Sequence, residues 1–327
     1  MRIGLGIPPL GFPFALCTTL VRQAEERGFE SIWIGEAWGT ETCTLVGALL
    51  ARSQRIVIGT GILSLYLRPP TLTAMQAATL QLIAPGRVRL GLGVSTRNIN
   101  TFHGLLWDYP VSRTREYVAL LRRLLAGERV TYQGRFYQPH GFQLGIPLLA
   151  PLPLYLAAVN PRMLRLAGEI ADGVLLAWLP ASQVSRSIAE IARGAETAGR
   201  APSAIDIGCY IHTVVTQDRK RTLKLLRRVL VGYCQANTYI EGFRRFGYGD
   251  ILDEVHDRWR IGDRAGAEAA IPERMVEDLY VFGTAAECRA HIDRFVQAGV
   301  QLPVVALPPS SRMSEKDFLA LMGAFGQ

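Results

Sequence analysis

The sequence predicts an α/β fold, a single (β/α)8 barrel of the TIM type. Short apolar, β-branched segments recur along all 327 residues, and a helical pattern follows each of them. Eight strands alternating with helices is the count of such a barrel. Glycines also cluster where predicted strands end, as in Gly59-Thr60-Gly61 and Gly91-Leu92-Gly93. Ligand sites of parallel barrels lie at that edge, and glycine allows a flat ligand to approach the backbone.

The eight predicted strands are short runs bounded by turn residues. In chain order they are Arg2–Ile7, Ser31–Gly35, Ile56–Gly61, Val88–Gly93, Leu154–Ala158, Gly173–Ala177, Ile205–Val215 and Val304–Leu307. The predicted helices between them are Phe14–Arg27, Thr71–Ile83, Arg113–Ala126, Pro161–Ile170, Val184–Ala198, Arg219–Val231 and Ala285–Ala298. A doubly wound open sheet is less consistent with the chain, because Gly4-Leu5-Gly6-Ile7-Pro8 lacks the third glycine of a dinucleotide-binding turn.

Two connections are long enough to be insertions, one after the fourth strand and one after the seventh. In the first, Arg129–Tyr132 and Arg135–Gln138 flank Gly134 as a predicted hairpin. The second, Tyr233 to Tyr280, is rich in aromatic residues and arginine. It follows a barrel strand, so we expect it to form a lid or a pocket wall over the active face. We expect residues 1–327 to form one domain.

Composition narrows the function. The net charge is +8, but we find no Lys/Arg-rich run or nucleic-acid motif, and no apolar stretch of about 18 residues that would span a membrane. The five scattered cysteines favour reduced thiols in a cytoplasmic protein. No metal-ligand spacing is present. The predicted partner is a small molecule, and the charge reflects either a polyanionic ligand or an arginine-rich composition.

Two residues are candidates for acid–base chemistry. Glu36 ends the second strand at the active face among apolar residues, and it either exchanges a proton or fixes a neighbouring amide or arginine. His212 lies in the seventh strand, where alternation places it on the same face as Tyr210. It either lines the barrel mouth or is a structural histidine.

Aromatic residues at strand ends are candidates for substrate contact. Trp38, Tyr66 and Trp178 each follow a predicted strand, and His103 lies in the loop after the fourth. Such rings either hold an aromatic substrate or pack the bases of loops.

Several segments resemble the bacterial luciferase-like superfamily, whose members use FMN or the deazaflavin coenzyme F420. The segments include GFESIWIGE, PGRVRLGLGVS and LYLAAVNPRMLRLAGEIADGVLL. The spacing Gly61-Ile62-x-x-x-Tyr66-x-Arg68-x-Pro70 is similar to that of the F420-dependent reductases, including methylenetetrahydromethanopterin reductase. The resemblance covers nearly the whole chain. It implies an F420-dependent oxidoreductase that transfers a hydride to or from an organic substrate.

Two other functions remain open at this point. One is an FMN-dependent monooxygenase of the same superfamily, supplied with reduced flavin by a partner reductase. The other is a flavin-binding protein without turnover. The resemblance also implies a homodimer, for which the apolar helices Thr71–Ile83 and Arg113–Ala126 would supply a face, and a flavin or F420 reductase as an indirect partner.

The resemblance further implies cofactor contacts at named positions. It places a cis peptide at Gly61-Ile62, backing the deazaflavin ring, and phosphate contacts at Val159, Asn160 and the start of the Pro161 helix. A helix amino terminus suits an anion, although Asn160 before Pro161 is equally an ordinary helix cap. The other cofactor residues expected along the same rim are Gly6, Leu63, Ser64, Gly93, Ser95, Thr96 and Arg97.

The chain also departs from the relatives it resembles. The His that often follows strand two is missing, because Glu36-Ala37 stands there. Where the sugar-phosphate branch has a phosphate clamp, this chain has Ala177-Trp178-Leu179-Pro180. We therefore expect an apolar or aromatic substrate.

Overall fold

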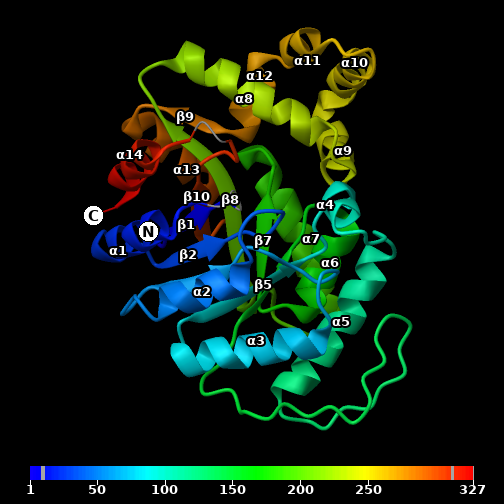
Figure 1. The fold of residues 1–327 in the computed structure, drawn as a ribbon. Helices are drawn as coiled ribbons and strands as arrows, with labels where there is room; N and C mark the ends of the chain where they lie inside the picture. The colour runs from blue at the N-terminus through cyan, green and yellow to red at the C-terminus, as the bar shows by residue number, and fades with distance from the viewer. Residues whose placement is uncertain (9–11, 311–312, 327) are drawn as a thin grey trace.

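The computed structural model describes residues 1–8, 12–310 and 313–326. It confirms the predicted barrel. Its strands are all parallel and neighbour one another in chain order, and the pairing of β8 with β10 closes the ring (Figure 1). The barrel strands are β1 (Gly4–Ile7), β2 (Ser31–Ile34), β3 (Val57–Thr60), β5 (Val88–Gly93), β6 (Leu154–Ala157), β7 (Gly173–Ala177), β8 (Asp206–Val215) and β10 (Leu302–Ala306). Two short strands were not predicted: β4 (Leu63–Ser64) pairs with β5, and β9 (Val281–Gly283) pairs with the end of β8.

Helices surround the barrel and pack their apolar faces on it. They are α1 (Phe14–Glu26), α2 (Thr42–Leu50), α3 (Pro70–Ile83), α5 (Pro110–Leu125), α6 (Pro161–Ile170), α7 (Val184–Thr197), α13 (Ala285–Gln297) and α14 (Glu315–Phe325). The sequence reasoning missed α2 and α14. The start of α2 is capped by the carboxylate of Glu41, which accepts hydrogen bonds from the backbone N–H groups of Cys43 and Thr44. Glutamate is not among the preferred capping residues, so the start signal was not apparent.

Large side chains fill the barrel interior because glycines make room for them. Trp33 is fully buried beside Tyr155, and a Cβ added at Gly59 would come within 2.7 Å of the Trp33 ring. A Cβ at Gly6 would come within 2.8 Å of the Tyr210 ring. The missing side chain of Gly6 therefore makes room for neighbouring protein atoms within the barrel.

The amino ends of the strands carry a charged network. Arg2 bonds to Glu30 and Asp206, Arg89 bonds to Glu30, and the Tyr155 hydroxyl donates to Asp206 at 2.6 Å. In a parallel barrel this end contributes stability, and the opposite end carries the chemistry.

The first insertion contains α4 (Arg97–Phe102), α5 and a long loop before β6. The predicted hairpin strands do not form. The loop instead folds back on itself through one antiparallel bridge, Val130 to Phe142, with single backbone bonds from Tyr132 to Pro139 and from Gly134 to Tyr137. Its turn is held from outside the loop by the Glu116 carboxylate, which accepts from the backbone N–H groups of residues 135 to 137.

The second insertion is helical and gathers above the barrel (Figure 1). It runs through α8 (Arg219–Cys234), α9 (Asn237–Phe243), a π-helical turn η3 (Arg244–Tyr248), α10 (Gly249–Arg260), α11 (Arg264–Ala270) and α12 (Glu273–Leu279). Its buried side chains form a core of their own, which includes Phe243, Leu252, Val255 and Met275. Single helical turns η1 (Ala181–Gln183) and η2 (Pro202–Ala204) flank α7.

Within the described residues, no helix is long and apolar enough to cross a membrane. Among the same residues, no cluster of His, Cys, Asp and Glu could hold a metal ion. All five cysteines are buried and unpaired.

Candidate active site

The carboxyl end of β3 carries the feature that the family resemblance implied. The Gly61-Ile62 peptide bond is cis, which confirms that expectation. The Tyr210 hydroxyl donates to the carbonyl oxygen of Gly61 at 3.1 Å, so β8 supports the bulge across the barrel. Gly61 and Ile62 are partly exposed at the mouth, whereas the Leu63 side chain is fully buried in the core and cannot face a ligand.

Gly61 tolerates no side chain because Tyr210 occupies the space. A Cβ there would overlap the Tyr210 hydroxyl oxygen. We expect Gly61→Ala to lower the free energy of unfolding by about 1–3 kcal/mol, the usual cost of overpacking. Adding Tyr210→Phe should recover part of that loss because it removes the overlapping atom. Urea denaturation measures both, and Gly145→Ala, where a Cβ would meet nothing within 4 Å, is the matched control. Simple additivity of the two substitutions would contradict this steric account.

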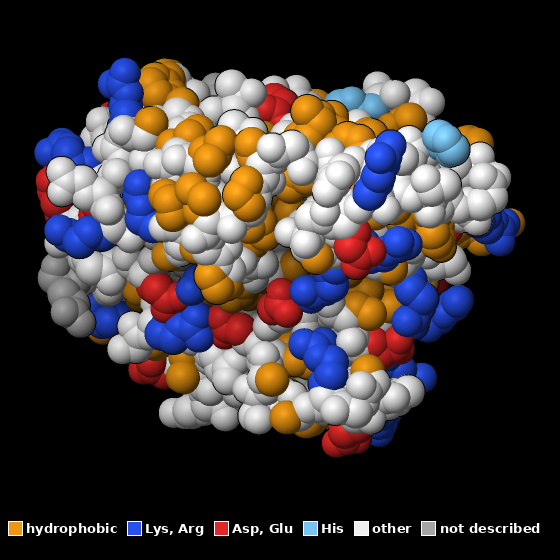
Figure 2. Space-filling model, turned by 90° about the horizontal axis from the view of Figure 1, so that it is seen from below, with side chains coloured by type: hydrophobic (Ala, Val, Ile, Leu, Met, Phe, Trp, Pro, Cys, Tyr) orange, Lys and Arg blue, Asp and Glu red, His pale blue; other side chains and the backbone are white. Residues whose placement is uncertain are grey.

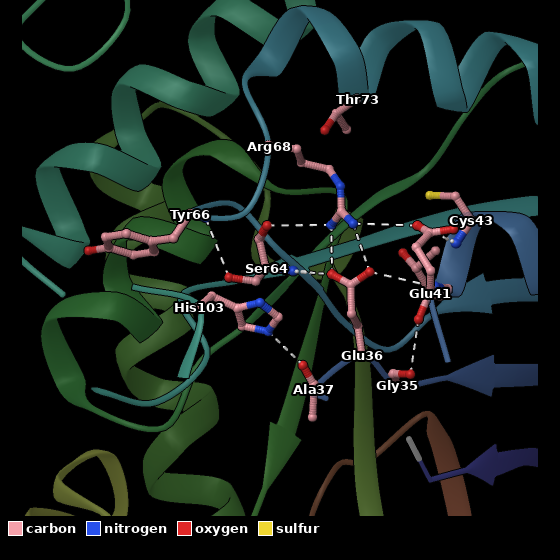
Figure 3. A network of polar contacts seen from close by, with 12 residues as sticks. Gly35, Glu36, Ala37, Glu41, Cys43, Ser64, Tyr66, Arg68, Thr73 and His103 are labelled. Atoms are coloured by element: carbon pink, nitrogen blue, oxygen red, sulfur yellow. Dashed lines mark hydrogen bonds and ion pairs between the residues drawn. The ribbon is translucent and has the colours of Figure 1, made fainter. Parts of the chain in front are cut away.

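Glu36 forms a bidentate ion pair with Arg68 (Figure 3). Both guanidinium-to-carboxylate distances are 2.7 Å, and the two side chains are only 7% and 6% exposed. Backbone N–H groups of Ser64 and Thr42 lie 3.4 and 3.5 Å from the same carboxylate. The expected apolar surroundings of Glu36 are therefore wrong, and the alternative reading, a carboxylate that fixes an arginine, describes its contacts.

The ion pair joins three segments of the active face. Burial by itself would lower the pKa of Arg68, but its hydrogen bonds to Glu36 raise that pKa above the ordinary value. Arg68 also reaches Glu41, the cap of α2, at 3.4 Å, and its side chain lies 3.5 Å from the Ser64 carbonyl. The end of β2, the start of α2 and the bulge around β4 are thus held together by one guanidinium group.

The other residues predicted around the barrel mouth differ in their exposure and in their contacts. The His103 ring bonds to the Ala37 carbonyl at 2.9 Å and ties the first insertion to the loop after β2 (Figure 3). Trp38 is 63% exposed and packs edge-on against Phe102. Tyr66 points away from Glu36, donates to the backbone of Asp108 and stacks with Arg113. Its contacts are those of a packing residue.

Trp178 and His212 lie together where β7 and β8 end. Their ring centroids are 4.4 Å apart, and Trp178 also packs against Tyr233 at 3.8 Å and Tyr280 at 5.4 Å. Trp178 has a left-handed backbone, with φ of 58°. Such a conformation is unusual for a bulky residue and is more frequent at functional sites. Since Tyr233 and Tyr280 belong to the second insertion, that insertion forms a wall of the site.

His212 is a neutral imidazole in this setting. Burial lowers its pKa to about 4, and a hydrogen bond with the Leu307 backbone opposes that shift only in part. Its Nδ1 is buried without a partner among the described residues. Because Nδ1 has no partner, we assign the proton to Nε2, which leaves the lone pair of Nδ1 free.

A second pocket region lies beside the start of α6. Its walls come from the β6 and β7 ends, α7 and α9. Asn160 precedes α6 without capping it by its side chain. Its side-chain oxygen instead accepts from Arg245 at 2.7 Å, and its amide donates to the Thr238 carbonyl at 3.3 Å. The N–H groups at the start of α6 are thus uncapped, and Val159 lines the same pocket.

The predicted anion contacts after β5 serve mainly their own loop. The Thr96 hydroxyl caps α4 by accepting from the Ile99 N–H, and Arg97 lies over the Trp107 ring at 5.7 Å. Ser95 has a left-handed backbone, with φ of 55°, directly at the strand end. A Cβ at Gly93 would come within 3.1 Å of Ile62, which keeps the cis bulge against β5.

Sequence reasoning missed three site residues. Arg68 was visible in the Arg68-Pro69-Pro70 loop but was not paired with Glu36, because the two are far apart in sequence. Arg186 and Arg245 come from α7 and the second insertion, and for the second insertion the sequence indicated only a stretch rich in aromatic residues and arginine.

The chain matches a protein-family model described as luciferase-like monooxygenase over residues 3–302. The chain belongs to this family. Among curated relatives, a protein of Mycobacterium tuberculosis named as a coenzyme F420-dependent oxidoreductase is 29% identical, and the alignment covers 93% of each chain. The 5,10-methylenetetrahydromethanopterin reductase of Methanolobus tindarius is 28% identical over 88% of each chain.

Solved structures of the family share the fold. The F420-dependent tetrahydromethanopterin reductase from Methanopyrus kandleri superposes with a TM-score of 0.83 at 23% identity, covering 98% of this chain and 97% of that one. An FMN complex of a Baeyer-Villiger monooxygenase component from Pseudomonas putida has a TM-score of 0.70 at 18% identity, covering 98% and 96%. The protein is an oxidoreductase of the luciferase-like family, as the resemblance in its sequence implied.

Proposed function

We propose that this enzyme uses coenzyme F420 and transfers a hydride between the deazaflavin and a small apolar or aromatic organic substrate. The similarity over 93% of the chain to a relative named as a coenzyme F420-dependent oxidoreductase carries the proposal. FMN-dependent monooxygenases share the fold at lower similarity and are the competing reading.

The residues present fit a deazaflavin nucleotide. The cis bulge at Gly61-Ile62, supported by Tyr210, offers backbone to a flat ring at the barrel mouth. The uncapped start of α6 beside Val159 and Asn160 suits the phosphate, because free N–H groups and the helix dipole favour an anion. When bound, F420 supplies a hydride donor or acceptor, and the protein supplies orientation and proton transfer.

His212 is the residue that we propose for proton exchange. Its Nδ1 lone pair is free, and its low pKa keeps the ring neutral at physiological pH. A neutral imidazole accepts a proton from an alcohol as the hydride leaves, or returns one in the reverse direction. Glu36 is engaged on both oxygens by Arg68, so we assign it the role of positioning the bulge.

Aromatic side chains line the region where we propose that the substrate binds. Trp178, Tyr233 and Tyr239 surround the region between β7 and the second insertion. Trp38 at the opposite rim is exposed enough to contact such a substrate.

Cofactor titration tests the proposal directly. We expect the deazaflavin to bind at micromolar or lower concentration and FMN to bind more weakly, because a relative similar over 93% of the chain is named as F420-dependent. Fluorescence titration of purified protein with each compound measures this. Tight FMN binding without F420 binding would favour the monooxygenase reading. F420 binding without turnover on a broad panel of alcohols, ketones and alkenes would favour a binding protein.

We also propose a homodimer formed through α3. The exposed face of α3 carries Leu72, Met75, Leu82 and Ile83, each between 40% and 49% exposed. Figure 2 shows hydrophobic side chains gathered on the side of the molecule where α3 lies. A second copy of the same helix would cover this stripe.

A further inference from the structure

We infer that Tyr280 and His212 together bind one hydroxyl group of the substrate. The Tyr280 hydroxyl would donate to the substrate oxygen, and the Nδ1 atom of His212 would accept the substrate's hydroxyl proton. This inference rests on the proposed function, because it names the group that the proton-exchanging residue meets. It adds a substrate-binding residue from the second insertion, and it makes the substrate an alcohol rather than an alkene or an imine.

The hydroxyl group of Tyr280 is buried and unpaired. The residue is only 1% exposed, and its hydroxyl oxygen has no hydrogen-bond partner among the described residues. Buried hydroxyl groups are normally hydrogen-bonded, and an unpaired one costs stability, so it points to a ligand. The three other buried tyrosines of the described residues each have a partner: Tyr117 bonds with Thr73, Tyr155 with Asp206 and Tyr248 with Asp278.

Tyr280 and His212 are neighbours at the end of the barrel. Strands β8 and β9 pair in parallel, with Thr213 beside Val281. His212 and Tyr280 directly precede these two residues, and their ring centroids are 6.1 Å apart. One oxygen atom with a hydrogen bond to each ring can span that separation. Since the Nδ1 atom of His212 is also buried without a partner among the described residues, two unpaired polar atoms belong to neighbouring rings.

His212 faces the barrel mouth, where we propose that the cofactor ring binds. Side chains alternate along a strand, so His212 shares its face with Tyr210, whose hydroxyl donates to the Gly61 carbonyl oxygen. His212 lies two residues farther along β8, which is about 6.6 Å nearer the mouth at the usual rise per residue. The residue is also partly exposed. A substrate carbon held at the ring beside Gly61-Ile62 would therefore place its oxygen toward His212.

The indole ring of Trp178 covers both groups. Its centroid lies 4.4 Å from that of the His212 ring and 5.4 Å from that of the Tyr280 ring, and Trp178 is only 6% exposed. An apolar cover excludes water and strengthens the hydrogen bonds beneath it. Because the indole contacts both rings, its side chain has to shift when a substrate oxygen enters between them.

The two groups have opposite hydrogen-bonding capacities. Burial, together with the nearby Tyr233 and Cys234, raises the pKa of Tyr280 well above its ordinary value, so its hydroxyl keeps its proton and donates. Burial lowers the pKa of His212 to about 4, so Nδ1 remains an acceptor at neutral pH. An alcohol satisfies both groups, whereas a carbonyl oxygen satisfies only Tyr280.

This arrangement suits oxidation of the alcohol. The O–H bond breaks and its proton passes to Nδ1 of His212. The C–H bond on the same carbon breaks and its hydride passes to the oxidised deazaflavin, which is the electron acceptor, while the C=O bond forms. Tyr280 keeps its own proton and holds the oxygen throughout.

Ligand binding tests the pair without turnover. Isothermal titration calorimetry on the full chain without cofactor compares 1-phenylethanol, acetophenone and cumene, which carry a hydroxyl group, a carbonyl oxygen and a methyl group on the same skeleton. We expect Tyr280→Phe to weaken binding of the alcohol and the ketone by about threefold to tenfold, the effect of one hydrogen bond between uncharged groups, and to leave cumene binding unchanged. His212→Phe should weaken binding of the alcohol alone.

Tyr248→Phe is the matched control, because Tyr248 lies in the same insertion, is 3% exposed and bonds with Asp278. It should lower the midpoint of thermal unfolding and leave all three affinities unchanged. Tyr280→Phe should leave that midpoint unchanged, because the hydroxyl that it removes has no protein partner among the described residues.

Four results would overturn the inference. They are no binding of 1-phenylethanol to the wild type, an unchanged affinity for it in Tyr280→Phe, an equal loss of cumene binding in that variant, and a drop in its unfolding midpoint. Failure of F420 to bind while the ligand pattern holds would count against the proposed function instead.

Discussion

Replacing Arg68 with methionine is expected to destabilise the protein by about 3–5 kcal/mol, the usual cost of removing one partner from a buried ion pair. The substitution would leave the Glu36 carboxylate buried with only two long contacts to backbone N–H groups. It would also free the bulge around β4, so we expect the affinity for the deazaflavin to fall as well. Urea denaturation and fluorescence titration measure the two effects.

A double variant that also changes Glu36 tests whether the loss of stability comes from the unpaired carboxylate. Glu36→Gln combined with Arg68→Met removes both charges and should recover much of the lost stability, because no uncompensated charge remains. Arg22→Met is the matched control: Arg22 pairs with Glu26 on α1, but the two side chains are 66% and 58% exposed. Its loss should stay below about 0.5 kcal/mol. A similarly small loss for Arg68→Met would show that the buried pair contributes nothing to the fold.

His212→Phe is expected to lower kcat by about 10²- to 10⁴-fold for substrates whose reaction needs a proton acceptor or donor. Phenylalanine keeps the ring contact with Trp178 and removes the free lone pair of Nδ1. The affinity for the deazaflavin should change little, because none of the cofactor contacts proposed above involves His212. His140→Phe, in the long loop before β6, is the control. Equal kcat for His212→Phe and wild type would remove His212 from the mechanism.

The pH dependence of His212 gives an independent measurement. Its folded-state pKa is about 4, whereas its ordinary value is 6.5. Between these values the unfolded chain binds the proton and the folded protein does not, so this residue makes the free energy of unfolding fall as pH falls from 6.5 toward 4. His212→Phe should lack that part of the acid sensitivity. The acid limb of kcat/KM in the wild type should also lie near pH 4 and be absent in the variant.

The barrel strands were predictable because each depends on a local pattern. Val88–Gly93 and Gly173–Ala177 have the boundaries that were expected, since turn residues bracket both apolar runs. The helices between Tyr233 and Tyr280 were not predicted, because charged residues interrupt their apolar faces and their core forms only when the segment folds back on α8.

Site residues that directly follow a single strand could be predicted from the sequence. Contacts between side chains from two distant segments could not. The family resemblance implied the cis bond, and Ser95 and Trp178 were candidates because they follow single strands; the structure gives all three positions an unusual backbone. The surroundings of Glu36 depend on Arg68, which lies 32 positions later in the sequence. The loop around β4 brings Arg68 next to Glu36. The contact of Arg245 with Asn160 spans 85 positions and two separate elements. Pattern and propensity carry no information about such pairs.

The close packing of large side chains against glycines in the barrel has a consequence for engineering this enzyme. Gly6, Gly59 and Gly61 are matched to Trp33 and Tyr210 within the barrel, so a change on one strand requires a compensating change on another. The second insertion has its own core and meets the barrel mainly through the rings around Trp178. Laboratory evolution toward new substrates should therefore accumulate substitutions in α8 and α9 and leave the barrel interior unaltered.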